Sequence, residues 1–342
     1  MRDEVQIDAR SAGPVLSLTK GALALRLWGC LRSGHACSRG LLHLLVLAMF
    51  VLSALTPRLS FAQAADVPYV PTPMNVVEAM LNIAKVGPDD FVIDLGSGDG
   101  RIVIMAARKY GARGFGVDLD GALVAQARRE AERQGVKDRV EFHARNLFIT
   151  DIDRATVVTA YLFPAVNMQL RPRIFSELKA GTRIVSHEFD FGNWKPDEQV
   201  RVPVPGKSYG PPSSEVFLWI VPANAAGRWQ WRVAIDGTPV ECEVAFDQTF
   251  QMLQGSGRAA GRAARIEGAR LRGEDIAFAL VAEVNGREIR QELTGRITGD
   301  TIRGQSRIAG AGGEAEWQAT RVARGKIILA ATAGMPAVAA SF

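Results

Sequence analysis

Two acidic residues and three glycines stand at a spacing that could bind a small organic cation. Asp94 ends a short apolar run, and Gly96, Gly98 and Gly100 follow it at alternate positions. Asp118, 24 residues after Asp94, ends the next short run of this kind. A glycine-rich turn between a strand and a helix lets backbone N–H groups and the helix N-terminus approach a ligand closely. The pattern therefore predicts a ligand loop here.

The spacing of the glycines excludes two common nucleotide-binding loops. A dinucleotide loop requires the pattern G-x-G-x-x-G, and counted from Gly96 the position of the third glycine holds Arg101. A P-loop requires Gly-Lys-Ser/Thr, and the loop from Asp94 to Gly100 has no such triplet. We therefore do not expect this loop to bind a chain of phosphates.

S-adenosylmethionine fits the loop better, because it carries an ammonium, a sulfonium and a ribose diol but no phosphate. Asp94 at a strand tip can hold the cationic amino acid end, directly or through water, and the bare glycines admit the chain of the ligand. Asp118 lies where a neighbouring parallel strand would present it to the ribose hydroxyls. The alternative is a pair of exposed strand-end acids beside an ordinary tight turn.

Strands and helices must alternate to bring these residues together, and the hydrophobic pattern predicts that they do. Such alternation is typical of a doubly wound, Rossmann-like α/β sheet with helices on both faces. A helical pattern from Val76 to Ala84 ends at Gly87-Pro88, because proline cannot continue a helix. Strands are then expected at 91–95, 114–117, 140–143, 156–162, 183–188 and 215–221, and helices at 101–110, 122–134 and 168–178.

The periodicity changes from helical to alternating after a linker at residues 222–227. Turn signals at Asp236-Gly237, Asn285-Gly286 and Thr298-Gly299-Asp300 separate strand-like runs. The sequence therefore predicts a second, smaller all-β domain over 228–322, an antiparallel barrel or sandwich of about eight strands. Its tryptophans at positions 229, 231 and 317 are interpreted as core. The tail at 325–342 has no periodic partner after Lys326 and is expected to be loosely ordered.

Four segments between residues 66 and 222 resemble class I S-adenosylmethionine-dependent methyltransferases. Within that class the similarity is to the small mitochondrial-type protein lysine methyltransferases that modify the ATP synthase c-ring protein and the adenine nucleotide carrier. The segments are Tyr69-Val70-Pro71-Thr72, Asp94 to Ile102 (DLGSGDGRI), Phe163 to Leu170 (FPAVNMQL) and Phe189 to Trp194 (FDFGNW). The first two are more specific than the last two.

The resemblance implies a set of cofactor contacts. In the family the Tyr/Pro/Thr segment borders cofactor and target, and an acid after the third strand contacts the adenine amino group. This chain has Asn146 at that place, and an amide oxygen can accept the same hydrogen bond. The expected cofactor-binding residues are Thr72, Asp94, Gly96, Ser97, Gly98, Asp99, Gly100, Arg101, Asp118, Leu119, Asn146 and Leu147.

Methyl transfer from a sulfonium is an in-line displacement, so the protein must chiefly align acceptor, methyl and sulfur. A lysine acceptor has an ordinary pKa of about 10.4 and must lose a proton before it attacks, which an apolar slot can promote. His187 with Glu188 could form a basic pair, although a single histidine at a strand end is more often simply hydrogen-bonded. The candidates to face the acceptor are Tyr69, Tyr161, Asn167, Glu188 and Asp190, and Tyr161 could equally be a packed aromatic.

Charge and cysteine content narrow the possible partners. The net charge is +5, but residues 1–64 carry seven basic and three acidic side chains, which leaves +1 for the remainder. Clustered Lys and Arg are needed to displace counterions from a phosphate backbone, so no nucleic-acid partner is expected. Beyond residue 64 only Cys242, His143 and His187 could supply soft or imidazole ligands, so no metal site is expected.

A leader precedes the predicted domains. The apolar run Leu41 to Leu55 follows Arg32 and Arg39 and is followed by Ala62-Gln63-Ala64, the order of a signal peptide with its cleavage site. The run is shorter than the roughly 20 residues that cross a bilayer, which favours cleavage over anchoring. We expect the folded part to be exported or held at a membrane, and to be cytoplasmic only if the start is misassigned.

Three functions remain open at this point. The first is methylation of a protein lysine, on a membrane protein for example, with the β domain helping to dock it. The second is methylation of a small molecule. The third is an exported binding module that kept the fold without catalysis, because the cofactor is made in the cytoplasm.

Overall fold

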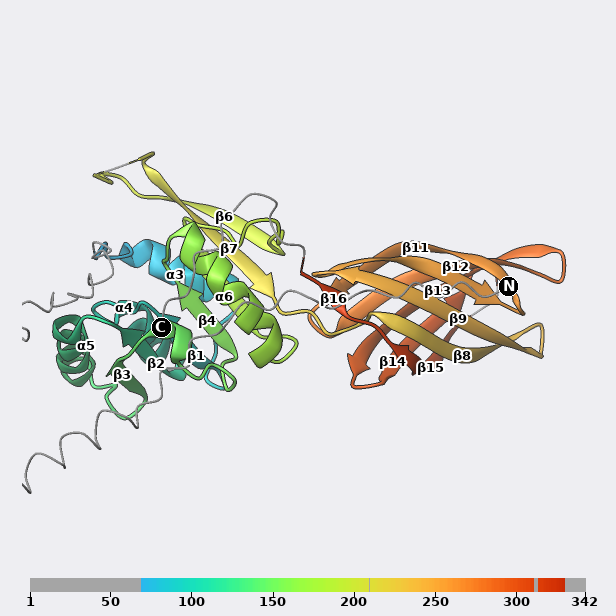
Figure 1. Cartoon of the computed structure of the whole chain (residues 1–342), viewed down its shortest axis with the longest axis horizontal. Helices are drawn as coiled ribbons and strands as arrows, with labels where there is room; N and C mark the ends of the chain where they lie inside the picture. Colours follow the sequence, from blue (N-terminus) through green and yellow to red (C-terminus); the bar gives the residue numbers. More distant parts are fainter. Residues whose placement is uncertain (1–68, 209, 311–312, 330–342) are drawn as a thin grey trace, which may run out of the picture. The chain divides into compact units, whose positions relative to one another are not determined.

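The computed structural model of the protein describes residues 69–208, 210–310 and 313–329 (Figure 1). The predicted signal peptide or anchor at 41–55 lies outside these residues. Two β-sheets make up the described part, one of seven strands and one of nine. Each is treated separately below.

The first sheet has the strand order β3-β2-β1-β4-β5-β7-β6. Neighbours from β3 to β5 run parallel, whereas β7 is antiparallel to both β5 and β6. The doubly wound sheet predicted from the sequence is confirmed. Its strands are β1 (Phe91–Leu95), β2 (Arg113–Asp118), β3 (Val140–Ala144), β4 (Val157–Ala160), β5 (Arg183–His187), β6 (Glu198–Pro203) and β7 (Ser213–Ile220).

Helices cover both faces of this sheet, so its central strands are buried on both sides. Val92 packs with α3 (Met74–Ile83) and α4 (Arg101–Tyr110), whereas its neighbour Ile93 packs with α6 (Pro164–Glu177). α5 (Gly121–Arg133) joins α4 over β3, on Val140 and Phe142. All four residues of β4 are buried. The apolar runs read from the sequence are therefore interior strands.

Two elements of the first sheet differ from the prediction. α6 begins at Pro164, four residues before the expected start at Met168, and proline at the first helical position is a recognised start signal. β6 was expected to be irregular chain between 195 and 214. It is an edge strand with almost every residue exposed, so it lacks the apolar alternation that would reveal it.

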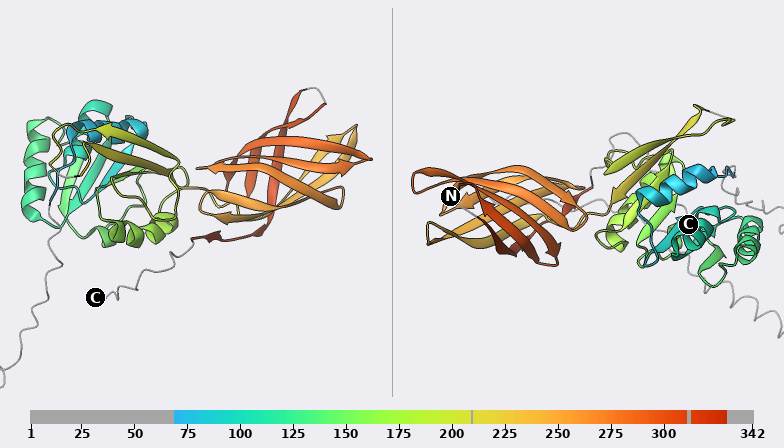
Figure 2. Two further views of the ribbon diagram at one scale, coloured as in Figure 1. Left: turned by 90° about the horizontal axis from the view of Figure 1, so that it is seen from above. Right: turned by 180° about the vertical axis from the view of Figure 1, so that it is seen from behind.

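The second sheet closes on itself. Its strands β8 to β15 pair antiparallel in sequence order, and β10 pairs with both β9 and β11. Both views in Figure 2 show these strands curving around a common centre. The domain is therefore a barrel, not the sandwich also considered. The strands are β8 (Gly227–Ile235), β9 (Thr238–Thr249), β10 (Met252–Ala259), β11 (Arg262–Arg272), β12 (Asp275–Val284), β13 (Arg287–Thr298), β14 (Thr301–Ile308) and β15 (Glu314–Arg324).

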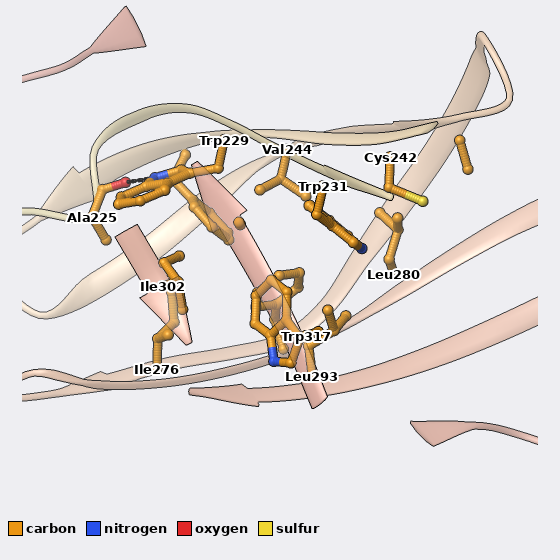
Figure 3. Packing of buried hydrophobic residues seen from close by; sticks show 14 of the residues in the cluster. Ala225, Trp229, Trp231, Cys242, Val244, Ile276, Leu280, Leu293, Ile302 and Trp317 are labelled. Carbon is orange, nitrogen blue, oxygen red and sulfur yellow. Dashed lines mark hydrogen bonds between the residues drawn. The ribbon is translucent and has the colours of Figure 1, made fainter. Parts of the chain in front are cut away.

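Three tryptophans fill the barrel, as predicted (Figure 3). Trp229 is fully buried, and its indole N–H donates to Ala225 O at 2.8 Å. Trp317 donates to Thr294 O at 2.8 Å, and Trp231 meets it edge to face at 5.5 Å between ring centroids. The indole N–H groups of Trp229 and Trp317 each have a partner, so the aromatic interior is a satisfied core.

The barrel surface carries its positive charge on arginine alone. Residues 227–324 include 14 arginines and no lysine. Many of these arginines pair with carboxylates across neighbouring strands, as Arg232 does with Glu241 and Arg307 with Glu292. After the barrel, β16 (Ile327–Ile328) pairs parallel with β9, so the prediction that the tail has no partner is wrong for these two residues. Residues 330–342 lie outside the described part.

Candidate functional site: a cofactor crevice at the carboxyl edge of the first sheet

The predicted ligand residues gather where the strand order reverses. β1 lies between β2 and β4, and the connections that leave β1 and β4 run in opposite directions along the sheet. Such a reversal leaves a crevice at the carboxyl ends of the strands, where α/β proteins bind their ligands. Asp94 lies near the end of β1 and Asp118 ends β2. The sheet thus brings the two carboxylates to the same edge, as expected.

Asp94 is a buried carboxylate, with only 2% of its surface exposed. Thr159 on β4 donates its hydroxyl to Asp94 Oδ1 at 2.7 Å. Burial raises the pKa of Asp94 to about 7, and the nearby charges of Asp118 and Asp99 act in the same direction. Among the described residues no cation pairs with it. A buried acid in this state is stabilised by a cationic ligand, so its chemistry fits the ammonium of the expected cofactor.

Asp118 shapes the glycine loop as well as facing the crevice. Its Oδ2 accepts from Gly98 N at 2.8 Å, and its Oδ1 accepts from Asp120 N at 2.9 Å. Each carboxylate oxygen has a further lone pair, so the group can still accept from ribose hydroxyls. Gly98 and Gly100 have φ of +51° and +79°, values that favour glycine.

The loop is closely covered by side chains. A Cβ on Gly98 would lie 2.3 Å from the Tyr69 ring, and one on Gly96 would lie 3.0 Å from Leu162. Ser97 is buried, and its hydroxyl has no partner among the described residues. A buried, unpaired hydroxyl beside bare backbone is a group that a polar ligand can satisfy. The loop therefore fits a slender polar ligand that lies against its backbone.

A row of polar contacts leads from the loop toward the end of β5. Arg101 holds Asp99 through two nitrogens and donates from Nη1 to Thr72 O at 2.8 Å. Burial alone would raise the pKa of Asp99, but hydrogen bonds from Arg101 and Tyr69 lower it below its ordinary value. Thr72 Oγ1 in turn lies 3.1 Å from His187 Nδ1. The Tyr/Pro/Thr segment thus borders the loop, as the resemblance implied.

His187 is a neutral, buried ring at the end of β5. Burial lowers its pKa to about 4, so it carries no charge near neutral pH. The Tyr161 ring lies 4.0 Å from it, centroid to centroid, and Nε2 of His187 has no hydrogen-bond partner among the described residues. Tyr161 therefore packs beside His187 immediately after β4, at the same edge of the sheet.

Glu188 follows His187 in the left-handed region, with φ of +63°. Its carboxylate pairs with the ammonium of Lys207. Burial alone would raise the pKa of Glu188, but hydrogen bonds from Lys207 and Ser214 lower it below its ordinary value. Glu188 is thus an anion that holds a cation, and a weak base. Lys207 was missed by the sequence analysis, because the loop between β6 and β7 has no motif that marks it.

Two candidates for the acceptor slot hold backbone. Asn167 is fully buried on α6, and its Nδ2 donates to Phe189 O and Asp190 O at 3.3 and 3.1 Å. Asp190 is exposed and accepts from Gly192 N at 2.9 Å. Both shape the loop after Glu188.

The expected adenine side is more open. Asn146 Oδ1 accepts from Phe148 N at 2.8 Å, which starts the short 3₁₀ helix Leu147–Ile149 and leaves one lone pair for a ligand. Leu119 is 71% exposed, and Leu147 is partly buried against the α6 side of the sheet. The structure thus places these residues beyond the ends of β2 and β3.

Two further searches of the described residues gave negative results. Within 69–329, apart from the gaps, no three His, Cys, Asp or Glu side chains come together as metal ligands would. No helix in that part of the chain has the length and hydropathy needed to cross a bilayer.

The fold and the crevice together define a class I S-adenosylmethionine-dependent methyltransferase, and S-adenosylmethionine is its cofactor. Within that class, the chain belongs to the protein-lysine N-methyltransferase family. Residues 94–198 match the family described as the ANTKMT methyltransferase domain. A protein-lysine N-methyltransferase of Saccharolobus islandicus (strain REY15A) is 44% identical over 156 residues, which are 45% of this chain and 94% of that protein.

Further matches cover similar shares of this chain. The adenine nucleotide translocase lysine N-methyltransferase of Mus musculus is 35% identical over 44% of this chain and 66% of its own length. The lysine N-methyltransferase of the ATP synthase c-ring protein from Xenopus laevis is 35% identical over 38% of this chain and 57% of its own. A solved RNA methyltransferase from Salinibacter ruber, in complex with S-adenosyl-L-homocysteine, is 50% identical over 44% of this chain and 93% of its own, with a TM-score of 0.41.

Proposed function

We propose that this enzyme transfers a methyl group from S-adenosylmethionine to the side-chain amine of a lysine in another protein. The observation that carries the proposal is the pair of strand-end carboxylates on a glycine loop, in a chain that is 44% identical to a protein-lysine N-methyltransferase over 94% of that relative. The names of the relatives place lysines of the ATP synthase c-ring protein and of the adenine nucleotide translocase among the substrates of this family.

The residues of the crevice divide the work of binding. Asp94 holds the ammonium of the amino acid end, Asp118 accepts from the ribose, and Asn146 accepts from the base. The bound cofactor supplies an electrophilic methyl group on a sulfonium. Tyr69 and Leu162 cover the loop closely and exclude water from it. The protein thereby fixes the direction from which an acceptor can approach.

The acceptor amine must arrive neutral, because an ammonium has no free electron pair. The Tyr161 ring and the neutral His187 form an aromatic wall beside Glu188, with no positive charge of their own. Such surroundings disfavour a charged amine and promote loss of its proton. No residue of the site has to act as a strong base.

The test is to incubate the purified protein with tritiated S-adenosylmethionine and cell extract separated into protein, RNA and small-molecule fractions. We expect label in protein, released as N-methyl-lysine on hydrolysis. The control is Asp94→Asn, which is expected to lose the label. Label confined to RNA would refute the proposal, and label in a small metabolite would favour the alternative of a small-molecule methyltransferase.

We further propose that the leader exports the enzyme or holds it at a membrane. The support is the sequence order of basic flank, apolar run Leu41 to Leu55 and Ala62-Gln63-Ala64. The check is a topology reporter fused after residue 342 of the full chain. A signal from outside the cytoplasm is expected, and a cytoplasmic signal would contradict the proposal.

A further inference from the structure

The enzyme already holds a lysine ammonium in a cage of oxygen atoms. Lys207 Nζ pairs with the Glu188 carboxylate and donates to Ser213 O at 2.8 Å and Ser214 Oγ at 3.2 Å. The Lys207 side chain is only 7% exposed. These oxygens form a pocket for a primary ammonium, and the chain itself supplies the occupant.

The cage lies at the edge of the sheet that carries the cofactor loop. Glu188 directly follows β5, and its backbone N–H donates to Glu215 O on β7 at 2.8 Å. β7 runs antiparallel to β5, so the start of β7 at Ser213 and Ser214 meets the carboxyl end of β5. Lys207 reaches this edge from the loop between β6 and β7.

The cage is also joined to the loop through direct contacts. His187, the residue before Glu188, contacts Thr72, and Arg101 binds Thr72 O from the start of α4. On its other side the His187 ring meets Tyr161, which follows β4 next to Asp94 on β1. An amine in or near the cage therefore shares this aromatic wall with the cofactor loop.

Other carboxylates at this edge already have tasks. Asp94, Asp99 and Asp118 serve the glycine loop and Arg101, and Asp190 is exposed and caps Gly192. Glu188 is the carboxylate of the described site whose bound partner is a lysine. We propose that Glu188, with Ser213 and Ser214, is the recognition group for the acceptor lysine, and that Lys207 holds its place until the acceptor arrives.

The chemistry of this exchange is balanced. The incoming lysine ammonium replaces that of Lys207 at Glu188 and gives up a proton to water as it moves against the aromatic wall. Its nitrogen lone pair then forms the N–C bond to the methyl group, and the C–S bond breaks. The electron pair of that bond stays on sulfur, which yields the thioether S-adenosylhomocysteine. Glu188 selects and positions the amine, and it does not itself form a bond.

The experiment empties the cage and offers a lysine side-chain analogue. In Lys207→Ala, added n-butylamine should enter the cage and be converted to N-methylbutylamine, which is measured by mass spectrometry. We expect at least a tenfold higher rate than in the wild-type chain, where Lys207 competes. Lys207→Ser is the second variant, because its hydroxyl can still bond to Glu188 if the alanine variant folds poorly.

The matched controls separate the cage from general effects. Lys195→Ala removes an exposed lysine and should leave butylamine methylation at the wild-type level. The double variant Glu188→Gln with Lys207→Ala should lose the gain while binding cofactor with the same affinity by calorimetry. A gain that persists in the double variant, or no gain in either Lys207 variant, would overturn the inference.

The inference rests on the proposed function, and the two can fail separately. If the wild-type enzyme labels lysine in the protein fraction and Lys207→Ala gives no butylamine product, only the role of the cage is wrong. If the wild-type enzyme labels no lysine in any fraction, the proposed function fails, and with it the inference.

Discussion

Asp94 couples cofactor binding to pH at the scale of one residue. Its raised pKa of about 7 means that the free protein binds a proton there at pH 6, which a bound ammonium would displace. We expect the affinity for S-adenosylmethionine to be about fivefold weaker at pH 6 than at pH 7.5, with protons released on binding. Calorimetry in buffers of different ionisation enthalpy measures both, and pH-independent binding would contradict this role.

The same residue affects stability with a definite sign. A carboxyl group whose folded-state pKa is raised takes up protons on folding, so stability falls as the pH rises from about 4 to about 7. Asp94→Asn should remove this slope, and it should also remove the pH dependence of cofactor binding. Urea denaturation at pH 5 and pH 7.5, with and without cofactor, checks both statements.

Asp118 can be tested against a neighbour with a purely structural task. Asp118→Ala removes the acceptor of Gly98 N as well as the proposed ribose contact, so cofactor affinity should fall roughly 10- to 100-fold, or about 1 to 3 kcal/mol. Asp120 accepts from Ala122 N at the start of α5, and its alanine variant should cost about 1 kcal/mol of stability. Equal cofactor affinity in the two variants would show that the ribose is misplaced.

The residues that sequence could predict are those that repeat a local pattern. Asp94, the glycines and Asp118 are each fixed by a strand end, and parallel pairing of β1 with β2 brings them together. Thr159 and Lys207 escaped prediction because their contacts depend on pairing between distant segments. Thr159 reaches Asp94 only through the β1–β4 register, and Lys207 reaches Glu188 through an irregular loop.

At the scale of the elements, apolar runs predicted the interior strands well and an edge strand poorly. β1, β4 and β5 are buried on both faces, and their positions agree with the prediction within a few residues. β6 packs little apolar surface and is held by hydrogen bonds to β7, which leave no trace in composition. Turn pairs such as Asn285-Gly286, with φ of +52° and +75°, correctly marked the hairpins of the barrel.

The barrel core gives a prediction at this scale. Trp229 has no exposed surface, and the guanidinium of Arg321 lies 4.0 Å from its ring centroid. Trp229→Ala should lower the free energy of unfolding of the barrel by about 3 to 5 kcal/mol, because it leaves a large cavity. Gln230→Ala, at the exposed neighbouring position, should change it by less than about 0.5 kcal/mol. Urea denaturation followed by far-UV circular dichroism measures both.

At the scale of the whole molecule, the composition of the barrel bears on what the enzyme does to itself. After long incubation with cofactor, tandem mass spectrometry should find any N-methyl-lysine on the enzyme outside residues 227–324, which contain no lysine. Substituting an exposed arginine, as in Arg232→Lys, adds a single test amine to this surface. A methyl group there would show that the chemistry accepts a lysine on a barrel strand.

A guanidinium keeps its charge and its cross-strand ion pairs, yet its nitrogens are far poorer nucleophiles than a free amine. The barrel therefore cannot compete with incoming proteins for methyl groups, whichever way the rest of the molecule faces. Turnover on the enzyme's own surface would waste cofactor and accumulate its inhibitory thioether product. The choice of arginine over lysine spares this domain both losses without any shielding structure.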